Sequence, residues 1–152
     1  MILEKSEFVR YYTFLDALFN GIEEFRKSYW LISDHELNHD EAERLNSHPV
    51  LISGEKLRKL LSEVKTQFIW GVLSAFENPE IDLNQPLPFA DGNPEFWSGS
   101  PRPQHPDASF EIVCWDSSCT LFVGVNSRVA VQLKKIFPDI KDLDMENQRR
   151  VS

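Results

Sequence analysis

The feature that most limits how this chain folds is a proline-rich stretch from Glu77 to Asp116. It holds seven of the nine prolines in a sequence of 152 residues. Proline has no backbone N–H and is excluded from the interior of helices and central strands. Residues 78–108 are therefore expected to form one long loop. Loops of this length in a compact domain are usually either functional or disordered.

The same stretch carries most of the net charge of the chain. It has eight acidic residues against a single base, Arg102, in a protein whose formal net charge is −8. Such a field repels the phosphates of nucleic acids and anionic lipids and attracts basic proteins. Neither nucleic acid nor a membrane surface is an expected partner. A charge of this size also serves solubility alone.

Periodic apolar residues predict three helices. One covers residues 8–22, although residues 7–12 also fit a strand; the second follows the capping residue Ser53; the third follows Asn126 or Ser127 and ends at Pro138. Apolar runs rich in β-formers predict strands at residues 29–32, 50–52 and 66–76. A hairpin is predicted from residues 110–115 and 119–125, with both of its faces covered.

This order of elements predicts the α+β class. We expect a single domain over residues 1–152, with an antiparallel or mixed sheet of about 4–5 strands packed on about 2–3 helices. Residues 144–152 are charged and are expected to be a frayed tail. The chain has no signal-like start, no apolar run of membrane-spanning length and only two cysteines, so a cytoplasmic protein without a cofactor is expected.

The segment His35-Glu36-Leu37-Asn38-His39 matches the H-E-x-x-H pattern of zincin metalloproteases. On a helix, His35 and His39 would share one face and hold zinc, and Glu36 would polarise the bound water. The acidic neighbours and the strand-like run before the segment favour a solvated turn instead. A small zinc-dependent hydrolase is therefore the alternative function.

A second catalytic alternative pairs Cys114 with His48 or His105 as nucleophile and base. Cys114 lies in a very apolar predicted strand, where a cysteine is more often inert than reactive. The sequence also lacks the glycine motifs of phosphate-binding loops and nucleophile elbows.

The best candidate site is in the long loop. Phe96 and Trp97 are large aromatic residues among the acids Asp82, Asp91 and Glu95, an arrangement that favours docking of a basic protein. The alternative is that Phe96 and Trp97 fold back and cover the core.

Four segments resemble parts of small bacterial α+β proteins, some of which are acidic immunity proteins of toxin systems: FEIVCWDSSCTLFVGV, LKKIFPDIKDL, LISGEKLRKLL and FIWGVLSAFE. The resemblance implies a non-enzymatic, immunity-type inhibitor of a basic toxin domain, and it assigns no functional residue. A structural or regulatory protein whose acidity only keeps it soluble is the third hypothesis.

Overall fold

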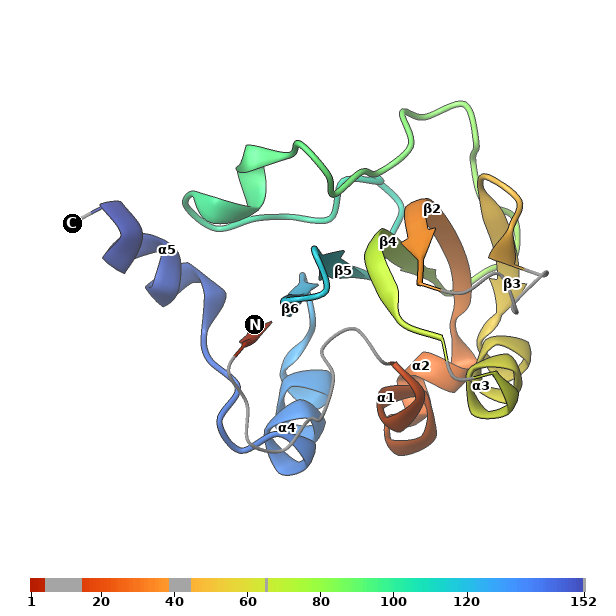
Figure 1. The fold of residues 1–152 in the computed structure, drawn as a ribbon, viewed down its shortest axis with the longest axis horizontal. Helices are drawn as coiled ribbons and strands as arrows, with labels where there is room; N and C mark the ends of the chain where they lie inside the picture. Colours follow the sequence, from red (N-terminus) through yellow and green to blue (C-terminus); the bar gives the residue numbers. More distant parts are fainter. Residues whose placement is uncertain (5–14, 39–44, 65, 152) are drawn as a thin grey trace.

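The chain folds into one α+β domain built on a six-stranded antiparallel sheet (Figure 1). The computed structural model describes residues 1–4, 15–38, 45–64 and 66–151. The helices between residues 16 and 136 cover one face of the sheet, and the long loop and the carboxyl-terminal helix lie against the opposite face. The predicted fold class is confirmed, with somewhat more strands than the four or five expected.

The strand order in the sheet is β1-β6-β5-β4-β2-β3. The hairpin of β5 and β6 and the strands β2, β3 and β4 are those that the sequence predicts. The additional strand is β1, which pairs with β6 and is too short to give a sequence pattern. The bounds are β1 (Ile2–Leu3), β2 (Tyr29–Leu37), β3 (Val50–Ser53), β4 (Phe68–Phe76), β5 (Phe110–Trp115) and β6 (Cys119–Val123).

Two helices begin at the predicted caps. Ser53 accepts a hydrogen bond from the backbone N–H of Lys56 at the start of α3, and Asn126 accepts one from Val129 at the start of α4. The described part of the predicted helix over residues 8–22 contains α1, which ends before Ile22; residues 5–14 lie outside the described residues. The bounds are α1 (Asp16–Gly21), α2 (Glu23–Lys27), α3 (Gly54–Glu63), α4 (Ser127–Ile136), α5 (Leu143–Val151) and the 3₁₀ helix η2 (Pro94–Trp97).

The sheet has a core on each face. On the helix side, Trp30 packs against Phe19 and Phe25, with ring centroids 5.1 and 5.7 Å apart, and its indole N–H donates to Phe25 O. The smaller core on the loop side includes Val72, Val113 and Phe96. Because side chains of a strand alternate between faces, β5 contributes to both cores, as the sequence predicts.

The carboxyl-terminal residues differ from the expected frayed tail. They form α5, in which Leu143 and Asn147 are buried four residues apart. This spacing puts both side chains on one face of a helix. The strongly charged sequence between them hides that signal. None of the helices in the described ranges is long and apolar enough to cross a membrane.

Gly54 sets the distance between α2 and α3, and Gly54→Ala is expected to destabilise the fold. A Cβ at this position would overlap the backbone carbonyl oxygens of Phe25 and Arg26, and a shift of backbone atoms costs more than a rotamer change. Urea unfolding should show a loss of at least about 2 kcal/mol.

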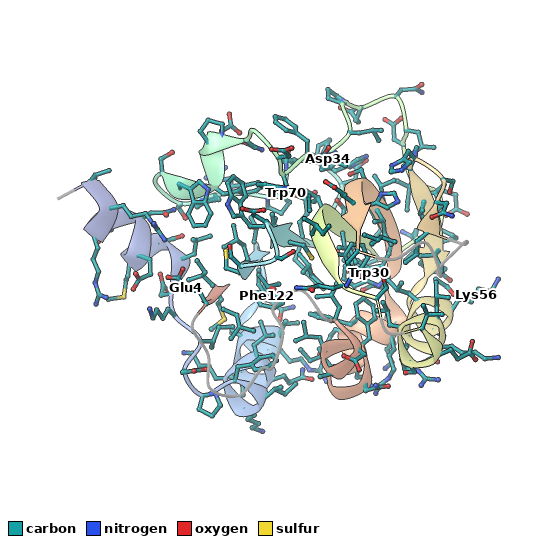
Figure 2. All side chains as sticks on the ribbon, viewed as in Figure 1. Glu4, Trp30, Asp34, Lys56, Trp70 and Phe122 are labelled. Carbon is teal, nitrogen blue, oxygen red and sulfur yellow. The ribbon has the colours of Figure 1, made fainter. Side chains whose placement is uncertain are left out.

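The matched control is Lys56→Ala in the same helix. Lys56 is exposed and points away from the sheet (Figure 2), so its loss should change the free energy of unfolding by less than about 0.5 kcal/mol. Equal stability of the two variants would contradict this account of the α2–α3 contact.

Candidate functional site

The long loop is anchored to the sheet by a buried carboxylate. Glu111 of β5 lies on the loop side and is fully buried. Its Oε1 accepts a hydrogen bond of 2.6 Å from the backbone N–H of Gln104, and its Oε2 accepts from the Ser74 hydroxyl at 2.6 Å and from the N–H of His105 at 3.3 Å. Burial raises the pKa of Glu111, and these three hydrogen bonds oppose the rise.

Gln104, which Glu111 holds, in turn holds the backbone of Phe89. Its side-chain amide donates to Phe89 O at 3.0 Å and accepts from Phe89 N–H at 3.1 Å. A single side chain therefore satisfies both backbone groups of Phe89, as a neighbouring strand would. Phe89 is fixed in position although no strand pairs with it.

Strand β2 holds the next residues of the loop. The Ser33 hydroxyl donates to Pro88 O at 2.7 Å, and one carboxylate oxygen of Asp34 accepts from the N–H groups of Ala90 and Asp91 at 2.9 and 3.1 Å. Asp34 has a φ of 51°, a left-handed conformation that aspartate tolerates better than most residues. Figure 2 shows Asp34 on the loop side of the sheet.

His105 closes the far end of the loop. Its Nδ1 accepts from Asp107 N–H at 3.1 Å, so its Nε2 carries the proton and donates to Asp82 O at 2.8 Å. Its ring lies edge-on to Phe76, with centroids 4.9 Å apart. Both ring nitrogens are thus used to hold the backbone of the loop.

This arrangement exposes some of the predicted docking residues and buries others. Asp82, Asp91 and Glu95 are exposed, whereas Phe96 is 1% exposed and fills the loop-side core. Trp97 is half-buried, with its ring edge-on to Trp115 at 5.0 Å. Phe96 therefore folds back and covers the core, which was the alternative prediction, and the Phe96 ring is not an exposed anchor.

Asp82 also stabilises the local turn. Its carboxylate accepts from the N–H of Asn84 at 2.9 Å and from the side chain of Gln85 at 3.2 Å. These hydrogen bonds hold the pKa of Asp82 below its usual range, so the carboxylate is charged at neutral pH.

The exposed apolar residues of the loop lie elsewhere. Leu83, Leu87 and Phe89 are 46, 43 and 45% exposed, while Pro88 and Ala90 point inward. The signal in the sequence is Pro-Leu-Pro-Phe at residues 86–89. The residue before a proline is biased toward extended backbone, in which alternate side chains share one side. Leu87 and Phe89 share the outer side, whereas the acidic neighbours of Phe96 favoured that residue as the predicted anchor.

The H-E-x-x-H segment is not on a helix where the structure describes it. His35 and Glu36 belong to β2, with His35 buried and Glu36 exposed. His35 Nε2 is bonded to Leu45 O and its ring stacks on His48 at 4.1 Å, and burial lowers the pKa of His35. His39 lies outside the described residues. Within the described ranges, no three His, Cys, Asp or Glu side chains gather as a metal site.

The structure does not bring Cys114 together with either candidate base. Cys114 is buried in the helix-side core, His105 lies on the loop side, and His48 stacks on His35. Burial raises the pKa of the Cys114 thiol far above its usual range. This environment agrees with an inert cysteine.

Comparison of the chain with protein-family models, with curated proteins and with solved structures finds no match.

Glu111→Ala is expected to loosen the loop. It leaves the N–H groups of Gln104 and His105 without their acceptor beneath the loop, at a cost of about 1–3 kcal/mol for a buried donor. Unfolding by urea should show that loss, and amide hydrogen exchange should quicken at Gln104. Glu95→Ala removes an exposed acid of the same loop and serves as the control. Unchanged protection of the Gln104 amide would contradict the anchoring role.

The raised pKa of Glu111 also predicts a pH dependence of stability. In the unfolded chain this carboxyl titrates near its model value of 4.5. Its contribution to stability is thus complete below that pH and is lost as the pH rises through the folded pKa. The unfolding free energy of the wild type minus that of Glu111→Gln should fall as the pH rises above about 4.5. A difference that stays constant or grows would contradict this sign.

Proposed function

We propose that the protein is a non-enzymatic, cytoplasmic binding module that captures a basic protein through the outer side of the loop at residues 78–108. The observation that carries this proposal is that Phe89 has an exposed ring on a backbone that is held in place. Its backbone is held on both sides by Gln104 while its ring stays 45% exposed.

The outer side of the loop combines an apolar centre with acidic surroundings. Leu83, Leu87 and Phe89 are the large exposed apolar residues of the segment, and exposed carboxylates occur on both sides of it in the sequence. Apolar anchors surrounded by charge are typical of protein interfaces. The exposed acids are Asp34, Glu80, Asp82, Asp91, Glu95 and Asp107.

The apolar surface extends toward the edge of the sheet. A shallow pocket lies between β3 and the start of the loop, lined by Leu51 and Ile52 from the strand and by Pro79 and Ile81 from the loop. Leu51 is 51% exposed. A partner that covers Leu83, two residues after Ile81, has this apolar pocket in which to place a side chain.

Anchorage of the loop reduces the cost of binding. A flexible loop loses conformational freedom when it docks, whereas Glu111, Gln104, Ser33 and Asp34 already hold this one. The exposed acids then contribute mainly to the rate of encounter and to the exclusion of acidic competitors.

A basic toxin domain is the partner class that the resemblance to immunity proteins implies. Electrostatic steering speeds the association of an acidic inhibitor with a basic enzyme, and the apolar anchors slow its dissociation. Asp82, Asp91 and Glu95 take the steering role in this proposal. Phe89 takes the anchoring role that the sequence suggested for Phe96, and Trp97 lies at the far end of the surface.

Phe89→Ala is expected to weaken capture of a basic partner. An anchor of this kind contributes about 2 kcal/mol or more, which corresponds to at least about thirtyfold in affinity. The partner retained from a cell extract by the immobilised wild type should be measured against the wild type and Phe89→Ala by surface plasmon resonance. Its association rate should fall as ionic strength rises.

The matched control is Val131→Ala, which truncates an apolar residue of α4 that is 52% exposed on the helix side. Equal affinity of the Phe89 and Val131 variants, or retention of acidic proteins only, would overturn the proposed function. An effect of His35→Ala on hydrolytic activity, with no partner retained, would favour the zinc hydrolase.

A further inference from the structure

Helix α5 places an arginine on the tryptophan of the loop. The guanidinium carbon of Arg150 lies 4.7 Å from the centre of the Trp97 ring. Trp97 is edge-on to Trp115, which is in turn edge-on to Trp70 at 4.8 Å. The three half-buried indoles come from η2, β5 and β4 and lie on the loop side of the sheet, where Figure 2 shows Trp70.

A carboxylate completes the surroundings of this guanidinium. Oε1 of Glu4 lies 4.0 Å from Nη2 of Arg150. An aromatic face together with a carboxylate is a combination suited to arginine, because its planar cation is weakly hydrated and stacks on rings. A lysine ammonium is more strongly hydrated and lacks the planar face.

Little buried apolar surface holds α5 on the domain. Leu143 is its one buried apolar side chain, and Met145 and Val151 are 55 and 81% exposed. A helix with so little buried apolar surface belongs to the part of a fold that opens most easily.

The polar contacts of α5 are incompletely satisfied. Asn147 Nδ2 donates to Phe96 O at 3.0 Å and to Gly99 O at 3.2 Å, and the Ser100 hydroxyl donates to Asp144 at 2.6 Å. The buried Oδ1 of Asn147 has no hydrogen-bond partner among the described residues. A buried acceptor without a donor opposes docking of the helix.

We propose that the Trp97 ring, backed by Trp115 and faced by Glu4, is an arginine-binding site that Arg150 occupies from within the chain. An arginine of the basic partner replaces Arg150 when α5 moves away. The identity of the natural ligand rests on the proposed function, but the site itself is defined by its own contacts. Arg150 acts as an internal competitor, so its removal raises the apparent affinity for an external arginine.

The experiment uses an acetylated, amidated tetra-arginine peptide, titrated into the full chain with ¹⁵N-labelled tryptophan. In Arg150→Ala, the indole N–H signals of Trp97 and Trp115 should shift with an affinity at least threefold tighter than in the wild type. The Trp30 indole is buried and bonded to Phe25 O, so its signal should stay in place and report an intact fold.

Two controls separate the arginine site from general charge effects. Arg149→Ala removes the same charge from the adjacent position, where the guanidinium lies 3.0 Å from Glu146, and should leave the affinity near that of the wild type. Tetra-lysine should bind more weakly than tetra-arginine. Trp97→Leu in the Arg150→Ala background should abolish the preference for arginine.

The site is overturned if Arg150→Ala binds tetra-arginine no tighter than Arg149→Ala, or if tetra-lysine binds equally well. Failure of the proposed function is distinguishable from these results. Phe89 makes none of the described contacts with Arg150, so an unaffected Phe89→Ala complex contradicts the anchoring surface and leaves the tryptophan site standing.

Discussion

The hydrogen bonds that converge on Glu111 determine what the proline-rich loop becomes. The loop at residues 78–108 holds seven prolines and adds no regular strand to the sheet, because too few of its N–H groups are available. Polar side chains supply the missing partners instead: Glu111 holds Gln104 and His105, and Gln104 holds Phe89. The carboxylate is buried at an electrostatic cost that raises its pKa, and the three donors around it offset only part of that cost.

The fixed loop, together with η2 and α5, covers this face of the sheet. Phe96 and Ala90 close the loop-side core, and the exposed residues alternate with them along the chain. The same alternation that buries Pro88 directs Leu87 and Phe89 outward. Exposed apolar groups on a rigid backbone are costly for a monomer and useful for an interface. The acidic surroundings then restrict which partners can approach.

The sequence predicts the elements whose signals are local. Ser53 and Asn126 mark the starts of α3 and α4, and β-branched and aromatic runs mark five strands. The sequence does not predict the features that depend on contacts between residues far apart in the chain. Phe89 and Phe96 both stand beside acids, and which one is exposed depends on Gln104, fifteen residues away from Phe89, and on Asp34, more than fifty residues from Ala90. Likewise, α5 depends on Asn147 reaching the backbone of η2.

Two sets of contacts act on the same loop. One set holds its backbone on the sheet, and the other determines whether Arg150 covers the Trp97 ring. Glu111, Ser33 and Asp34 hold the backbone from the sheet, whereas Asn147 and Arg150 approach from α5. Release of α5 uncovers the Trp97 ring, while Ser33, Asp34 and Glu111 still hold residues 88–91 and 104–105 on the sheet. Release of α5 leaves the net charge of this face unchanged, because the helix carries two acids, Asp144 and Glu146, and two bases, Arg149 and Arg150. A basic partner is thus favoured at this step by the vacated ring, while the exposed acids of the loop attract it as before, which gives the two proposed sites a physical reason to act together.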